Sequence, residues 1–128
     1  MVTPPPKLLP VLHKLKSAYL LWFSYTPTIP KVHRHSLAIR IDDLLVEVIE
    51  YTSMAGFLSP IEKIPYLRLA VRKLDTSKLL LMMLWETKSL QDKKFIAISA
   101  MLNGVGADLG GWLGKMVKEN SPRKPGEK

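Results

Sequence analysis

Apolar residues recur every three or four positions through most of the chain, a spacing that predicts helices rather than strands. The clearest stripe lies toward the C-terminus and comprises Phe95, Ile98, Leu102, Val105, Leu109, Trp112 and Met116. Three further stripes predict helices over about residues 7–25, over 31–58 and from about 59 to 85, and the C-terminal helix should span about 89–119. No strand-like alternation of useful length interrupts them.

Proline and serine mark the predicted helix boundaries. Pro27 and Pro30 end the first helix, because proline disfavours a helical conformation in the residue before it. Residues 59–62, Ser-Pro-Ile-Glu, form a capping box that opens the third helix, although Pro65 either kinks its first turn or moves its start to about residue 64. Residues 89–92, Ser-Leu-Gln-Asp, form a second capping box that opens the fourth.

Four helices joined by short connections predict an all-α fold, an antiparallel up-down-up-down four-helix bundle over residues 7–119. Residues 1–6 should form a flexible N-terminal tail. Residues 120–128 contain two prolines and several charges, so we expect a disordered basic tail there.

Glycines interrupt the C-terminal helix although each costs about 1 kcal/mol relative to alanine. Close approach of another backbone is the reason that we favour. The predicted helix-packing or oligomer positions are Gly106, Gly110, Gly111, Trp112 and Gly114. The third helix also carries a nearly continuous apolar run over 79–85, and the second has an additional apolar set at Ala38, Leu45, Val46 and Ile49. Both patterns fit either a wide core stripe or a subunit interface, and we favour the interface.

The chain is strongly basic, with 19 Lys and Arg against 11 Asp and Glu and a net charge of +8. This excess of positive charge favours a polyanionic partner, with nucleic acid as the first candidate and an anionic membrane surface as the second. The alternative is that the charge only keeps the protein soluble. The basic candidates for nucleic-acid or polymerase binding are Lys31, Arg34, Arg40, Arg68, Arg72, Lys73, Lys78, Lys88, Lys93 and Lys94. No base-reading motif accompanies them, so binding should be electrostatic and sensitive to salt.

Lys31, Arg34 and Arg40 crowd the start of the second helix, an end that the helix dipole makes favourable for anions. Two interpretations stay open for this cluster. One is an anion site. The other is a solvated loop whose arginines pair with Asp43 or Glu47.

Residues 95–117 are apolar enough to test for a membrane span, but Asn103 and Asp108 would lie near the bilayer centre at a cost of several kcal/mol. We therefore expect a core helix and no membrane partner. The N-terminus lacks the basic start and apolar core of a signal peptide, so we expect a cytoplasmic protein.

Enzymatic signals are weak. There is no cysteine, the three histidines have no ligand spacing, and no nucleophile or phosphate-loop motif occurs. We predict no enzyme activity, no cofactor and no metal site. The aromatic residues that fall on the helical stripes are predicted to be core: Tyr19, Trp22, Tyr51, Trp85 and Trp112.

Three segments together resemble the accessory variability determinant proteins of diversity-generating retroelements, a branch of the S23-type four-helix bundles. They are residues 28–41 (Thr-Ile-Pro-Lys-Val-His-Arg, then Leu-Ala-Ile-Arg-Ile after two residues), residues 66–74 (Tyr-Leu-Arg-x-Ala-x-x-Lys-Leu) and residues 106–115 (Gly-x-x-Leu-Gly-Gly-Trp-Leu-Gly-Lys). The similarity covers nearly the whole chain. In one departure, residues 80–84 are apolar where the family often carries arginines.

The resemblance implies a noncatalytic partner of the retroelement reverse transcriptase. It implies a homopentamer that binds the polymerase and template RNA, or the cDNA or RNA–DNA hybrid made from it, and supports mutagenic cDNA synthesis during mutagenic retrohoming. Lys31, Arg34 and Arg40 match basic positions of the family. The alternative is a generic S23-type helical interaction protein without a polymerase partner.

Overall fold

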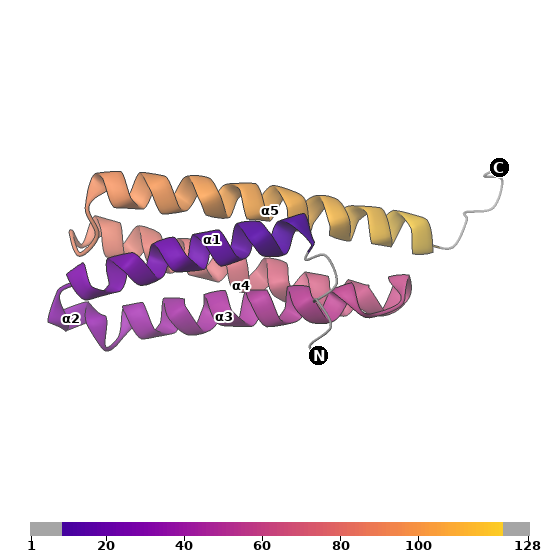
Figure 1. Ribbon diagram of the computed structural model, residues 1–128, viewed down its shortest axis with the longest axis horizontal. Coiled ribbons are helices and arrows are strands. Elements are labelled where there is room, and N and C mark those ends of the chain that lie inside the picture. Colours follow the sequence, from indigo (N-terminus) through magenta and orange to yellow (C-terminus); the bar gives the residue numbers. More distant parts are fainter. Residues whose placement is uncertain (1–8, 122–128) are drawn as a thin grey trace, which may run out of the picture.

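The computed structural model describes residues 9–121 and contains four long helices (Figure 1). They are α1 (Pro10–Tyr25), α3 (Leu37–Gly56), α4 (Pro60–Glu86) and α5 (Asp92–Asn120). A 3-10 turn, η1 (Thr26–Thr28), and the single-turn helix α2 (Lys31–Arg34) join α1 to α3. No strand occurs in this part of the chain, so the all-α prediction is confirmed.

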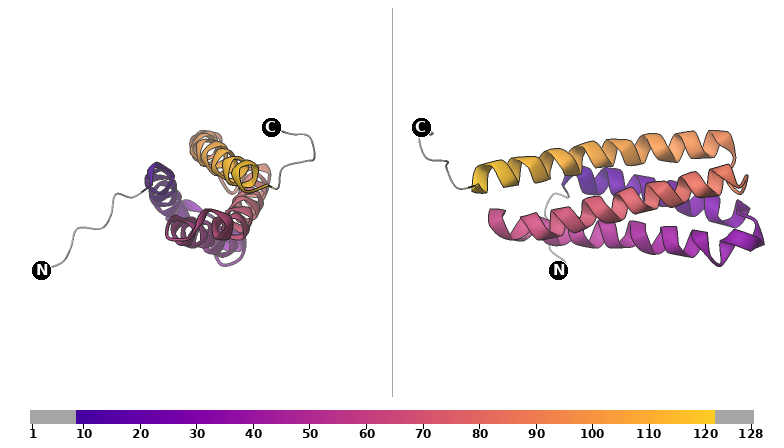
Figure 2. Two further views of the ribbon diagram at one scale, coloured as in Figure 1. Left: turned by 90° about the vertical axis from the view of Figure 1, so that its right-hand side faces the viewer. Right: turned by 180° about the vertical axis from the view of Figure 1, so that it is seen from behind.

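The long helices lie alongside one another, and their connections alternate between two ends of the molecule (Figure 1). η1 and α2 lie at the same end as the α4–α5 turn, whereas the α3–α4 connection lies at the opposite end. Each long helix packs mainly against two others: α3 against α4 and α1, and α5 against α4 and α1. The end-on view in Figure 2 shows the same arrangement.

The core forms between the four helices and follows the predicted stripes. On α5, the buried residues are Ile98, Leu102, Val105, Leu109 and Met116, all members of the predicted stripe. On α3, the additional apolar residues Ala38 and Leu45 are also buried inside the chain, at 4% and 1% exposure. A wide core stripe therefore accounts for these two residues without a subunit interface.

The predicted second helix, 31–58, is wrong as a single element. It is divided into α2 and α3 by a break at His35 and Ser36, where Ser36 has φ −129° and ψ −92°. Arg34 explains part of this break. Its guanidinium donates to the backbone carbonyls of Pro27 and Ile29, at 3.2 and 3.1 Å, and so ties α2 back onto the preceding turn.

One predicted capping box is present and the other is not. The backbone N–H of Ser59 donates to Glu62 at 3.4 Å, and α4 begins at Pro60 with Pro65 inside it, so Pro65 does not move the start. The second box is wrong: Gln91, not Ser89, is the N-cap of α5, and no side chain caps it. Both side chains of that expected box have other partners, described below.

The predicted flexible tail over 1–6 and most of the disordered tail over 120–128 lie outside the described residues. Asn120 is the last residue of α5 and donates its side-chain amide to the Met116 carbonyl. By length and composition α5 could cross a membrane, but a core helix passes the same test.

Candidate nucleic-acid interface

Two basic segments more than fifty residues apart in the sequence meet at one end of the molecule. They are α2 and the α4–α5 turn (Figure 1). His33 on α2 shares a hydrogen bond of 2.7 Å with the hydroxyl of Ser89 in the turn, and Lys94 donates to the hydroxyl of Thr28 at 2.9 Å. We call the surface formed by α2, the α4–α5 turn and the first turns of α3 and α5 the basic end. Its predicted site residues are Lys31, Arg34, Arg40, Lys88, Lys93 and Lys94.

Four of these six cations are exposed. They are Lys31, Arg40, Lys88 and Lys93, and within residues 9–121 none of them forms an ion pair. Lys94 is half-buried, and its ammonium lies 5.4 Å from the centre of the Tyr25 ring. The basic end therefore presents cations whose charge is not neutralised by a neighbouring carboxylate in the described structure.

Arg34 is not paired with Asp43 or Glu47 in the described structure. It is half-buried and its guanidinium donates to two backbone carbonyls, so its contact with an anion stays a prediction. Glu47 instead lies 3.1 Å from the ammonium of Lys73 on α4. The two atoms form an ion pair but are not aligned as a hydrogen bond. Arg34 thus shapes the basic end and contributes its charge from a partly covered position.

The four predicted cations of α4 do not form one surface. Arg68 and Arg72 are exposed and lie one turn apart on the same face. Lys73 points toward α3 and its ion pair with Glu47, whereas the Lys78 ammonium lies near Gly106 on α5. Arg72 lies about 21 Å along the axis of α4 from Glu86, the last residue of the helix before the turn that carries Lys88, at the usual rise per residue. Two separate basic surfaces result.

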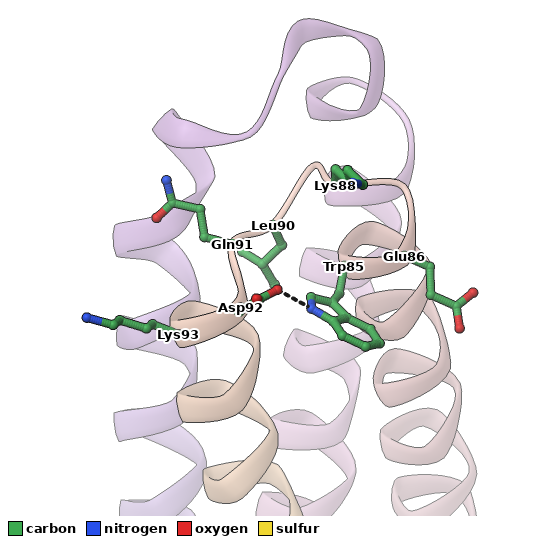
Figure 3. Close-up of a pocket in the computed structure, with 7 residues that line it drawn as sticks. All are labelled: Trp85, Glu86, Lys88, Leu90, Gln91, Asp92 and Lys93. Atoms are coloured by element: carbon green, nitrogen blue, oxygen red, sulfur yellow. Dashed lines mark hydrogen bonds between the residues drawn. The ribbon is translucent and has the colours of Figure 1, made fainter.

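A shallow cavity of about 640 Å³ lies at the α4–α5 turn (Figure 3). All of its lining residues except Leu90 are exposed. They are Trp85, Glu86, Lys88, Leu90, Gln91, Asp92 and Lys93. The turn itself depends on Lys88, which has a positive φ of 63°, and on hydrogen bonds from the backbone N–H groups of Ser89 and Leu90 to the carbonyl of Leu84.

Trp85 was predicted to be core, and this prediction is wrong. Trp22 is buried and Trp112 half-buried, but Trp85 is 37% exposed at the edge of the cavity. Its ring stacks on Phe95, with centroids 4.8 Å apart and planes 9° apart, and its indole N–H donates to Asp92 at 2.8 Å. The sequence carried one signal for this site, an aromatic residue in the last turn of a helix followed by three lysines within nine residues.

Within residues 9–121, no backbone from another helix lies close to the glycines of α5. A Cβ at Gly110, Gly111 or Gly114 would meet nothing within 4 Å, and at Gly106 it would lie 3.5 Å from Leu74. Packing within the described chain therefore does not require glycine at these positions. Their role in self-association stays a prediction.

Within residues 9–121, no group of three His, Asp or Glu side chains is placed to hold a metal ion. The carboxylate of Asp42 accepts hydrogen bonds from Tyr19 and Trp22, at 2.9 and 3.3 Å. Burial, and then the hydrogen bond and negative charge of Asp42, raise the pKa of the Tyr19 hydroxyl above its ordinary value. These contacts connect α1 to α3.

No protein-family model and no curated protein matches this chain.

Proposed function

We propose that this chain is a noncatalytic RNA-binding subunit, built as an antiparallel up-down-up-down four-helix bundle, that assists the reverse transcriptase of a diversity-generating retroelement. The observation that carries the RNA-binding part is the basic end, where Lys31, Arg40, Lys88 and Lys93 are exposed and lack ion pairs in the described structure. Cations arranged in this way neutralise phosphates without specifying a base sequence.

The alternation of the helix connections between the two ends supports the up-down arrangement (Figures 1 and 2). Three parts of the proposal rest on the family resemblance: the polymerase partner, the homopentameric assembly and the cytoplasmic location. The residues that carry this resemblance are 28–41, 66–74 and 106–115. The separation of the basic end from Arg68 and Arg72 supports two partners, since one surface can hold RNA while the other contacts protein.

RNA binding is tested by fluorescence anisotropy of the full chain with a labelled structured RNA, between about 50 and about 200 mM salt. The double variant Lys31→Glu/Lys93→Glu places acidic residues in the first turns of α2 and α5, where the helix dipole favours them. We expect the slope of log K against log salt to fall by about two units, because about 0.9 unit is lost per phosphate contact.

The matched control is Lys115→Glu/Lys118→Glu. It makes the same change of net charge in the last turns of α5, far from the basic end (Figure 1). This control should keep most of the affinity and the slope. Equal losses in the two double variants would mean that net charge, rather than the basic end, determines binding.

The polymerase part is tested by co-purification with a retroelement reverse transcriptase, with the mass of the complex measured by light scattering. A stoichiometric complex containing several copies of this chain supports the accessory-subunit proposal. RNA binding without any polymerase complex would leave the alternative, a generic S23-type helical interaction protein. The exposed Leu79, Met82 and Met83 on α4 favour a protein partner in either case.

A further inference from the structure

Trp85 stands out among the aromatic residues because it is held rigidly and yet is accessible. Phe95 covers one face of its indole, and the hydrogen bond to Asp92 fixes the edge that carries the N–H group. Figure 3 shows the ring at the edge of the cavity, with none of the other six labelled side chains lying over it. An aromatic surface held in one orientation loses little conformational entropy when a ligand stacks on it.

The charges around the ring favour a particular chemistry. Asp92 and Glu86 are among the residues that line the cavity, and their negative charges disfavour a phosphate inside it. The Asp92 carboxylate lies beside the indole and can accept a further hydrogen bond from a ring N–H or amino group, whereas the Glu86 side chain points away from the indole (Figure 3). Lys88 lies at the top of the turn, and Lys93 lies on the far side of the turn from the indole (Figure 3). These features favour a flat, uncharged ring with N–H donors next to the indole, and Lys88 and Lys93 supply positive charge for phosphates at the same turn.

We propose that this cavity binds one unpaired nucleobase, stacked on the free face of Trp85, while Lys88 and Lys93 contact the flanking phosphates. The inference deepens the proposed function, on which it rests, by naming single-stranded RNA as the preferred form. Bases of a duplex are stacked on their neighbours and cannot reach the indole, so they gain only the phosphate contacts. Aromatic stacking beside a basic surface is a common way to hold single strands without reading their sequence.

The experiment compares three probes of about 12 nucleotides, within the range that single-strand-binding modules cover. They are a single-stranded RNA, the same strand annealed to its complement, and an abasic strand with the same phosphates. Binding to the full chain is measured by anisotropy at one salt concentration. The single strand should bind roughly 5- to 150-fold more tightly than the abasic strand, as expected for one stacked base.

Two substitutions separate stacking from hydrophobic contact. Trp85→Leu keeps an apolar side chain against Phe95 but removes the aromatic ring, so the preference for the single strand should vanish. Trp85→Phe keeps an aromatic ring, so part of the preference should remain. Phe57→Leu removes another exposed aromatic residue, at the opposite end of the molecule, and should change nothing (Figure 1). Circular dichroism of each variant checks that the helices are intact.

A second readout does not depend on RNA binding. Guanosine monophosphate is titrated while tryptophan fluorescence is followed; quenching in the wild type and in Phe57→Leu, but not in Trp85→Phe, supports the cavity site. If the single strand and the abasic strand bind equally and the nucleotide causes no quenching, the nucleobase site is overturned while the phosphate-binding function stands. If none of the three probes binds, the proposed RNA-binding function fails. The fluorescence titration with guanosine monophosphate then decides by itself whether the cavity binds a nucleobase.

Discussion

The phenolic hydroxyl of Tyr19 on α1 donates a hydrogen bond of 2.9 Å to the Asp42 carboxylate on α3. The indole N–H of Trp22, one turn further along α1, lies 3.3 Å from the same oxygen. Asp42 therefore holds α1 against α3 through two aromatic donors. This contact complements the ion pair between Lys14 and Asp108, 2.8 Å apart, that connects α1 to α5.

Tyr19→Phe should lower the free energy of unfolding by about 1.5 kcal/mol near neutral pH, since one hydrogen bond to a carboxylate is lost. The pKa of Tyr19 is raised in the folded protein, so the unfolded chain loses this proton at a lower pH. The contribution of Tyr19 to stability is thus complete below pH 10 and is lost as the pH rises through the folded pKa.

The difference between wild type and Tyr19→Phe in urea unfolding should consequently shrink above about pH 10. Tyr25→Phe serves as a control, because within residues 9–121 the Tyr25 hydroxyl forms no hydrogen bond to a carboxylate. A difference that stays constant up to the highest pH at which the protein folds would contradict the assignment.

Thr52 is fully buried on α3, and its hydroxyl has no hydrogen-bond partner among the described residues. Thr52→Val replaces that hydroxyl with a methyl group of similar shape, so the free energy of unfolding should rise by about 1 kcal/mol. The measurement is the urea midpoint. Thr76→Val, at an exposed position whose hydroxyl bonds to the Arg72 carbonyl, should bring no such gain.

Lys88 adopts a left-handed conformation, with φ 63°, just after α4 ends. For a residue with a side chain this conformation costs roughly 1 kcal/mol, and glycine avoids that cost. Lys88→Gly should therefore raise the thermal midpoint. Lys93→Gly removes the same charge inside the first turn of α5 and should lower it, because glycine disfavours a helix interior. A loss of stability in both variants would show that the backbone of the turn is unstrained.

Gly110→Ala should raise the free energy of unfolding by about 0.5–1 kcal/mol, because the added Cβ meets nothing within 4 Å and alanine favours the helix. Gly56→Ala should gain less, since its Cβ would lie 3.3 Å from Leu9. Light scattering on the same samples tests the predicted role in self-association. If a second copy packs against Gly110, the alanine variant should form smaller oligomers than the wild type.

Local sequence determined the helices and most of their buried faces. The period of about 3.6 residues depends only on neighbours along the chain, so the stripe from Phe95 to Met116 was sufficient to define α5 and its core side. The capping box at Ser59 and Glu62 could be predicted for the same reason, since both partners lie within one turn. The second box failed because distant residues compete for its side chains: His33 binds Ser89, and Trp85 binds Asp92.

The tertiary structure alone decided which cations share a surface and which aromatic residue stays accessible. Lys31 and Lys88 are far apart in the sequence and do not belong to the same helix. The packing of the long helices brings α2 and the α4–α5 turn to the same end of the molecule (Figure 1). Lys73 forms an ion pair with Glu47 on α3 and so does not share the exposed surface of Arg68 and Arg72. The spacing of residues on α4 could not predict this contact, because its partner lies on another helix. Trp85 lies on an apolar stripe in the last turn of α4, yet it is 37% exposed, because Phe95 of α5 covers only one face of its indole.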